Sequence, residues 1–427
     1  MDFSFGAEDE ELRGHARAWL SEHLVGPYAQ AVGLGGPGSE HEGAEVRRAW
    51  ERELGRGGWI GQGWEADGWG NRRLSLTGQV VWAEEYAALR APGRVGHIGE
   101  NLLAPTLIAH GSPEQQGRFL PGIASGEELW CQGYSEPDAG SDLAGIRTAA
   151  VRDPADGLYR VTGQKIWTSL AHDADWCFVL ARTEPGSRRH RGLSFLLVRM
   201  DQPGRVEVRP IRQMSGTSEF NEVFFDGAVA AEVVGAEGDG WTVAMSLLAL
   251  ERGVSTLVQQ IGFAAELERV LASYAARAAS GAGDPVLRER LVRQWAELRT
   301  MRWNALRTLG AADGPSGAGG SGGPSGPRGP GGAGGPRDAV DVGAPSVAKL
   351  LWGGWHRRLG ELAVEVRGAA ATAGPALWAP GVPYEYGLDE EQRLFLFTRA
   401  DTIYGGSDEI QRNIIAERVL GLPKEPR

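Results

Sequence analysis

The stretch that decides the fold is WCQGYSEPDAGSDLAGIRT (130–148), followed after a short variable run by VTGQKIWTS (161–169). The first part sets several glycines among the hydroxyls of Ser135 and Ser141. Glycines let the backbone approach a ligand closely, and hydroxyl and freed N–H groups can hold phosphate or ring heteroatoms. The second part places Trp167 beside Thr168 and Ser169, which suits a planar aromatic cofactor stacked on one side. The same residues could instead form a loop-rich hairpin around a core tryptophan.

Length and composition narrow the class of protein. A chain of 427 residues exceeds one typical core, so we expect two or three domains. The net charge of −11 argues against a nucleic-acid partner. Cys131 and Cys177 lack paired spacing, which indicates free thiols in a reducing compartment and no metal site. The acidic N-terminus lacks a signal-peptide core, and no apolar run approaches the roughly 18 residues that span a bilayer. We therefore expect a cytoplasmic protein without a membrane partner.

The pattern of apolar residues divides the chain into three regions. Helical periodicity dominates before residue 129 and after residue 240, whereas short Val- and Phe-rich runs separated by Gly, Pro and Asp lie between them. The predicted fold class is α+β with a central antiparallel β-domain. The predicted regions are an N-terminal α-helical domain (1–128), the β-domain (129–238) and a C-terminal α-helical domain (239–427).

Two glycine-rich segments need separate interpretations. Gly33–Gly38 formally matches GxGxxG, but it follows a helix and carries Pro37 where a helix should begin, so we reject a dinucleotide site. Gly314–Pro336 contains 12 Gly, 5 Pro and 3 Ser in 23 residues, too little apolar surface to order itself. We expect a flexible insertion over residues 310–345, of which residues 314–336 should be dispensable.

The central stretch resembles the flavin-binding signature of the acyl-CoA dehydrogenase family, through SEPDAGSD and GQKIWTS. The match continues through GLSFLLV, MSGTSEFNEVFFDG and YGGSDEIQRNIIAERVLGLP, and excludes roughly residues 26–45 and 310–345. The resemblance implies a helical N-terminal domain, a β-domain, a C-terminal four-helix-bundle-like domain and bound FAD. It also implies which residues contact the cofactor: Gln132, Gly133, Tyr134, Ser135, Gly140, Ser141, Trp167, Thr168, Ser169, Ser407 and Glu409. Acyl-CoA would be positioned by Ser141, Leu250 and Arg252.

Dehydrogenation of an acyl thioester needs a base for the α-proton and donors for the thioester oxygen. In the family the base lies at one of two places. The first is Gly405 here, so that carboxylate is absent, although the Gly405 backbone N–H would still face the thioester oxygen. The second is Glu251, within a helix that the sequence predicts over Trp241–Leu271. Glu251 lies on a small, mostly apolar helix face, unusual for a charge unless something polar docks there. The alternative is a surface ion pair with Arg252.

The resemblance also implies partners and leaves alternatives open. The implied substrate is an acyl-CoA, the acceptor an electron-transfer flavoprotein, and the assembly a homodimer or homotetramer, with a heteromer possible. The alternatives are a same-fold oxidase or monooxygenase, and a non-catalytic partner subunit of a heteromeric dehydrogenase.

Glu365–Thr372 departs from the family pattern, which weakens the contacts expected there. Gly93–Gly99 borders the far end of the acyl chain by position in the family, and its small residues predict a roomy acyl pocket. Each histidine is interpreted as solvated or as part of the core.

Overall fold

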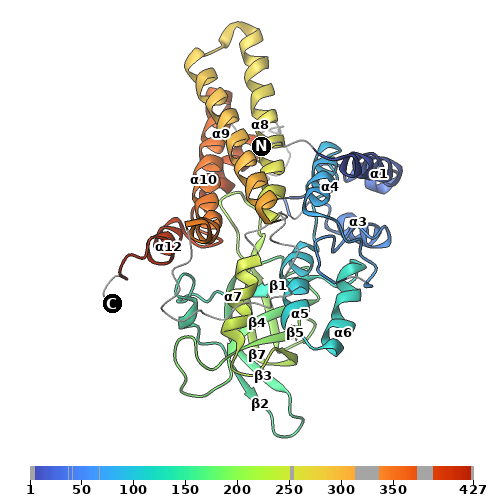
Figure 1. Cartoon of the computed structure of the whole chain (residues 1–427), viewed down its shortest axis with the longest axis vertical. Helices are drawn as coiled ribbons and strands as arrows, with labels where there is room; N and C mark the ends of the chain where they lie inside the picture. Colours follow the sequence, from blue (N-terminus) through green and yellow to red (C-terminus); the bar gives the residue numbers. More distant parts are fainter. Residues whose placement is uncertain are drawn as a thin grey trace, which may run out of the picture. The chain divides into compact units, whose positions relative to one another are not determined.

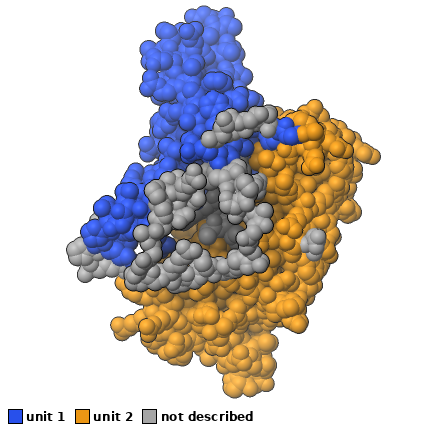
Figure 2. Space-filling view, viewed as in Figure 1, with its two compact units in different colours: residues 1–6, 253–427 blue, residues 7–252 orange. Residues whose placement is uncertain are grey.

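Figure 1 shows the chain in a computed structural model, and Figure 2 colours its two compact units. The N-terminal unit comprises residues 7–252, and the C-terminal unit comprises residues 1–6 and 253–427. The structure describes residues 5–36, 38–40, 42–66, 68–250, 254–312, 336–372 and 388–424, without the side chains of 249–250, 254–257, 308–312 and 336–342.

Helices of the N-terminal unit surround buried tryptophans. They are α1 (Ala7–His23), α2 (Pro27–Gln30), α3 (Ala44–Arg56), α4 (Leu76–Ala88), α5 (Ala104–His110), α6 (Pro113–Ala124) and, after the strands, α7 (Gly240–Leu250). Trp59 and Trp82 stack with ring centroids 4.0 Å apart, and both are buried. Large aromatic rings contribute strongly to core burial, so this pair ties α4 to the loop after α3. Ser112 caps α6 in a capping box, as its position before Pro113 predicts.

The sheet of the N-terminal unit closes on itself. Its strands are β1 (Trp130–Gly133), β2 (Ala149–Arg152), β3 (Tyr159–Ser169), β4 (Trp176–Arg182), β5 (Leu193–Arg199), β6 (Val206–Pro210) and β7 (Phe220–Val234). Pairing runs β1-β4-β2-β3-β7-β5, β6 pairs with β7, and β4 also pairs with β5, which completes a ring. The sequence predicts an antiparallel sheet, but β1 and β2 each pair with β4 in parallel. The reason is that long connections, not hairpins, separate these strands from β4.

One face of this sheet forms a shared core with helices. Phe178 and Phe195 stack across β4 and β5 with ring centroids 5.5 Å apart. They belong to one buried cluster with Leu107 of α5, Phe119 of α6 and Leu247 of α7. Figure 1 shows α5, α6 and α7 drawn alongside the strands, in agreement with that cluster. The core therefore fixes the strands that carry the signature stretch.

The C-terminal unit is helical. Its helices are α8 (Val254–Arg277), α9 (Pro285–Ala312), α10 (Pro336–Arg367), α11 (Glu390–Phe397) and α12 (Asp408–Ile414). Phe263, Leu291, Trp355 and Leu359 lie in its buried cluster and join α8, α9 and α10. Among the described residues, no helix is long and apolar enough to cross a membrane. The order of helical, β and helical parts confirms the predicted α+β class, and the boundaries after residues 128 and 238 stay predictions.

Candidate functional site

A buried ion pair joins the two halves of the signature stretch. Lys165 on β3 is fully buried, and its Nζ donates to Glu136 Oε1 at 2.9 Å. The same ammonium donates to Tyr134 O at 3.1 Å and to Leu180 O at 2.8 Å. A buried charge is tolerated only when it is paired and hydrogen-bonded, and Lys165 meets both conditions. The pair therefore holds the loop after β1 against β3.

Glu136 also organises the loop in front of β2. Its two carboxylate oxygens accept from the backbone N–H groups of Arg147 at 2.6 Å and Thr148 at 2.9 Å. Burial alone would raise the pKa of Glu136, but the Lys165 ammonium and these donors outweigh it and lower the pKa. The carboxylate is thus ionised, and it holds the two ends of the 136–148 loop together. Sequence reasoning missed both members of the pair, although a lysine at an inward-facing strand position is the available signal.

A bulge in β3 separates the orientations of neighbouring side chains. The pairing of β3 with β7 shifts register between Lys165 and Thr168. Trp167 has a φ of 61°, in the left-handed region that costs a non-glycine residue about 1–2 kcal/mol. Its side chain is 56% exposed, whereas Thr168 is fully buried. A bulge redirects a side chain in this way, and strained backbone of this kind is common at ligand sites.

Thr168 provides the test of whether the cofactor fits. Its Oγ1 is buried and has no hydrogen-bond partner among the residues that the structure describes. The Thr168 carbonyl is held by Asn221, whose Nδ2 donates to it at 3.0 Å. A buried hydroxyl without a partner costs free energy, which a heteroatom at a ring edge would recover. Together with the exposed Trp167 ring, this arrangement fits a flavin.

The structure brings the predicted cofactor residues of the β-domain onto neighbouring segments. The Ile166 N–H donates to Ser135 O at 2.9 Å, which joins the loop after β1 to β3. Of the predicted residues, Gln132 (partly buried) and Gly133 (buried) lie at the end of β1. The loop after it carries Tyr134 (buried), Ser135 (partly buried), and Gly140 and Ser141 (both exposed). Ser169 is partly buried at the end of β3. A hollow of about 300 Å³ lies between the 136–148 loop and β3, and its lining, which includes Pro137, Arg147 and Gly163, contains none of the predicted cofactor residues.

The C-terminal unit carries the second group of predicted residues, on one turn. Gly405 and Gly406 have φ values of 65° and 85°, which glycine adopts without strain. Gln411 Nε2 donates to Gly405 O at 3.1 Å, and the Gly405 N–H donates to no other residue that the structure describes. Ser407 caps α12 through its side chain, and Glu409 lies exposed in the first turn of that helix. The turn therefore presents a backbone donor.

The predicted base lies outside the part of the chain that the structure describes. This applies to Glu251 and Arg252, and Leu250 ends α7 without a described side chain. The sequence predicts a single helix over 241–271; the structure describes two parts of it, α7 up to Leu250 and α8 from Val254, and residues 251–253 lie outside the described part. The roles of these three residues therefore remain predictions.

The glycines of 93–99 do not leave space for a ligand. A Cβ added at Gly93 would lie 2.5 Å from the Gly36 nitrogen, and one at Gly96 would lie 2.6 Å from Glu51 Oε1. A Cβ at Gly99 would lie 3.0 Å from Trp130. These positions are small because other parts of the chain pack against them. The small residues of 93–99 are therefore no reason to expect a roomy pocket.

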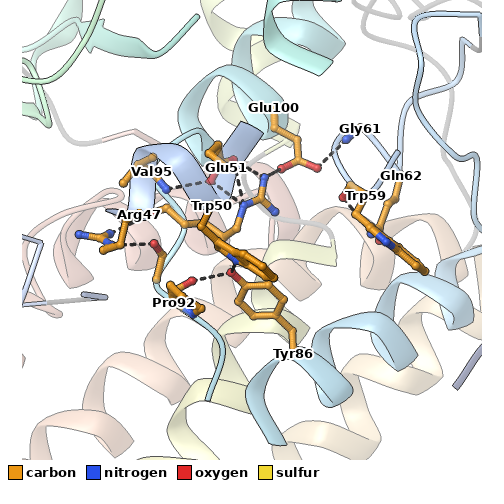
Figure 3. Close-up of polar contacts among 12 residues, drawn as sticks. Arg47, Trp50, Glu51, Trp59, Gly61, Gln62, Tyr86, Pro92, Val95 and Glu100 are labelled. Carbon is orange, nitrogen blue, oxygen red and sulfur yellow. Dashed lines mark hydrogen bonds and ion pairs between the residues drawn. The ribbon is translucent and has the colours of Figure 1, made fainter. Parts of the chain in front are cut away.

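Buried polar contacts around Glu51 explain that packing (Figure 3). The Arg94 Nη2 donates to Glu51 Oε1 and to Glu100 Oε2, both at 2.6 Å. Glu51 Oε2 accepts from the Val95 N–H at 3.2 Å, and Glu100 Oε1 accepts from the Gly61 N–H at 2.7 Å. Burial would raise the pKa of Glu51, and the Arg94 charge outweighs it and lowers the pKa. The network fixes the 92–100 segment against α3, which needs glycine at the points of closest approach.

Three family models match successive parts of the chain. Family models match residues 6–127 (acyl-CoA dehydrogenase, N-terminal domain), 131–228 (middle domain), and 238–321 with 333–420 (C-terminal domain). Acyl-CoA dehydrogenase IpdE1 of Mycobacterium tuberculosis is 53% identical over 421 residues, 98% of this chain and 99% of the relative.

Two solved structures are similar to the chain over its whole length. The "Tcur3481-Tcur3483 steroid ACAD" is 28% identical with a TM-score of 0.78, and the ChsE4-ChsE5 complex from Mycobacterium tuberculosis is 29% identical with a TM-score of 0.74. Both comparisons cover 100% of each chain. The chain therefore belongs to the acyl-CoA dehydrogenase family, FAD-dependent oxidoreductases that dehydrogenate acyl-CoA thioesters.

Proposed function

We propose that Glu251 is the base that removes the α-proton of the acyl-CoA. The observation that carries this proposal is the Gly405 turn, where the alternative carboxylate position holds a glycine with a φ of 65°. A dehydrogenase still needs a base, and Glu251 is the family's other position for it. A carboxylate in a dry site has its pKa raised toward useful basicity.

The remaining roles are proposed from the resemblance to the family, and the buried Thr168 and exposed Trp167 support those at the flavin ring. FAD supplies the acceptor for the hydride that leaves the β-carbon. Thr168 and Trp167 would hold its ring system, the segment 132–141 would line the site, and Ser407 and Glu409 would lie at the adenine end. The Gly405 N–H would donate to the thioester oxygen and so stabilise the negative charge that develops as the α-proton leaves. Ser141, Leu250 and Arg252 would position the acyl-CoA.

Proton removal can be tested apart from hydride transfer. A thioester whose β-carbon carries no hydrogen, such as 3,3-dimethylbutyryl-CoA, can lose its α-proton but cannot be dehydrogenated. In D₂O the wild-type holoenzyme should exchange the α-protons of this compound, followed by NMR, and Glu251→Gln should not. Exchange at the wild-type rate in Glu251→Gln would exclude Glu251 as the base.

We propose further that the acyl group carries fused rings. The support is the similarity to the "Tcur3481-Tcur3483 steroid ACAD", which has a TM-score of 0.78 over the whole chain. Size selection by a pocket is asymmetric, because a small acyl chain also enters a large pocket but loses its contacts there. Anaerobic flavin reduction across butyryl-, octanoyl-, cyclohexanecarboxyl- and steroid-carboxyl-CoA should be fastest with the last. A clear preference for butyryl-CoA would contradict the proposal.

We propose that the working enzyme contains a second, related chain. Two similar structures, Tcur3481-Tcur3483 and ChsE4-ChsE5, are each named as a pair of different chains. On α9, Val292, Trp295 and Trp303 are each about half exposed and lie at helical spacing along one stripe, which is typical of a protein contact. Co-expression with a paralogous acyl-CoA dehydrogenase should give a complex by light scattering, and Trp295→Glu should weaken it. A homo-oligomer with full activity would contradict the heteromer.

An electron-transfer flavoprotein is the acceptor that we propose for the reduced enzyme. Anaerobic reoxidation by such a protein should be much faster than reoxidation by air. The reverse order would favour the oxidase alternative.

A further inference from the structure

His356 is buried on α10 between two carboxylates. Its Nδ1 lies 2.8 Å from Asp401 Oδ2, and its Nε2 lies 2.7 Å from Glu266 Oε2 on α8. The side chain of His356 is 3% exposed and that of Asp401 is fully buried. A neutral imidazole has only one N–H, so its second nitrogen would place a lone pair against a carboxylate. The protonated ring satisfies both contacts.

Asp401 transmits this contact to the Gly405 turn. Its Oδ1 accepts from the Tyr404 hydroxyl at 2.7 Å, and Tyr404 directly precedes Gly405. The Asp401 carbonyl also accepts from Lys349 Nζ, a buried ammonium on α10. The Tyr404 N–H donates to Ala400 O at 3.1 Å, which closes the turn. The segment from 401 to 405 is thus held by side chains on α10.

The turn lies against α10 at two points, one of which is tightly packed. A Cβ added at Gly353 would lie 3.0 Å from Asp401 O, and one added at Gly405 would lie 3.6 Å from Lys349 Cε. The close approach at Gly353 therefore limits how far the Asp401 end of the turn can shift, and Lys349 lies within van der Waals reach of its Gly405 end. A shift of about 1 Å at a catalytic donor can cost roughly a hundredfold in rate.

We propose that protonated His356 is a positioning residue for catalysis: through Asp401 and Tyr404 it sets the place of the Gly405 N–H that receives the thioester oxygen. The proposal rests on the proposed role of Gly405. His356 does not itself touch substrate or cofactor in this scheme. Its loss should lower the rate of the chemical step more than the affinity for acyl-CoA, because the donor matters most when negative charge develops.

The groups that face His356 determine how its effect depends on pH. Burial lowers the pKa of His356, but Glu266 and Asp401 outweigh it and raise the pKa to about 9. Nearby, burial lowers the pKa of Lys349 to about 8, opposed by Asp401 and Asp408. Because the pKa of His356 is raised by folding, its contribution is complete at low pH and is lost as pH rises through about 9.

The test uses the holoenzyme and measures the limiting rate of anaerobic flavin reduction and the Kd for acyl-CoA. His356→Leu removes both contacts, and Tyr404→Phe removes one hydroxyl. Tyr274→Phe is the matched control, since the Tyr274 hydroxyl donates at 2.8 Å to Asp284 O in the α8–α9 connection. We expect rate losses of about 10- to 100-fold for His356→Leu and about 10-fold for Tyr404→Phe, with Kd changed less than about threefold. Tyr274→Phe should keep the wild-type rate.

The pH profile separates positioning from a loss of stability alone. The ratio of the wild-type rate to the His356→Leu rate cancels the ionisations that both proteins share, including that of Lys349. This ratio should fall toward one between about pH 7.5 and 10. A constant ratio, or a wild-type rate in His356→Leu and Tyr404→Phe, would overturn the inference. Glu251→Gln belongs in the same series: a wild-type rate there would contradict the proposed base instead.

Discussion

The buried pair of Lys165 and Glu136 allows the signature loop to be tested by substitution. Lys165→Met keeps the apolar stem and removes the ammonium. Glu136 would then remain as a buried charge with only its two backbone donors, and the carbonyls of Tyr134 and Leu180 would lose a donor. Removing one partner of a buried pair costs about 3–5 kcal/mol, so we expect a loss of that size in the free energy of unfolding.

Urea unfolding followed by tryptophan fluorescence measures this loss, and gel filtration measures retained flavin. The matched control is Arg147→Met, because the Arg147–Asp138 pair at 3.7 Å has side chains that are 82% and 78% exposed. An exposed pair of this kind contributes at most about 1 kcal/mol. Adding Glu136→Gln to Lys165→Met should recover at least about 1.5 kcal/mol relative to the sum of the single losses. A Lys165→Met cost no larger than that of Arg147→Met would refute the reasoning.

Three further expectations concern other parts of the chain. Burial and the neighbouring Glu219 raise the pKa of Glu40 to about 9, so above about pH 4.5 its ionisation lowers the free energy of unfolding. Glu40→Gln should therefore raise the free energy of unfolding by about 1–3 kcal/mol at pH 8 and leave it unchanged at pH 4. A difference between variant and wild type in urea unfolding that does not change with pH would contradict this. Adding Gly405→Glu to Glu251→Gln should restore less than about a tenth of the flavin-reduction rate, because a side chain in the left-handed region costs about 1–2 kcal/mol and Lys349 lies beside it; full recovery would contradict this. Replacing residues 314–336 by a short Gly-Ser turn should preserve flavin content and rate, since the family model omits 322–332, and loss of either would reveal a role for the segment.

Local sequence signals predicted the elements well where each signal is complete within a few residues. The cap at Ser112 and the Val- and Phe-rich strands are examples, because each depends on short-range chemistry. The parallel pairing of β1 with β4 was not predictable in this way. It depends on a register that pairs Trp130 with Trp176, and two other strands, β2 and β3, lie between these residues in the sequence.

The supporting contacts of the site depend on tertiary structure to a greater degree. Lys165 and Glu136 are 29 residues apart, and His356 lies 45 residues from Asp401 and 90 from Glu266. The interpretation of His356 as a core histidine is confirmed for its burial, but the two carboxylates give it a charge that no local pattern indicates. The glycines of 93–99 show the same dependence on tertiary structure, because small residues signal close packing as readily as open space.

Stopped-flow anaerobic reduction of the flavin by a good acyl-CoA substrate tests the proposed base most directly. Glu251→Gln is nearly isosteric and should retain flavin and bind acyl-CoA, while the rate of reduction falls by about three orders of magnitude, within the range for a general base. Glu268→Gln, on the exposed surface of α8, is the matched control and should reduce its flavin at the wild-type rate. Reduction of Glu251→Gln as fast as wild type would remove Glu251 from the mechanism.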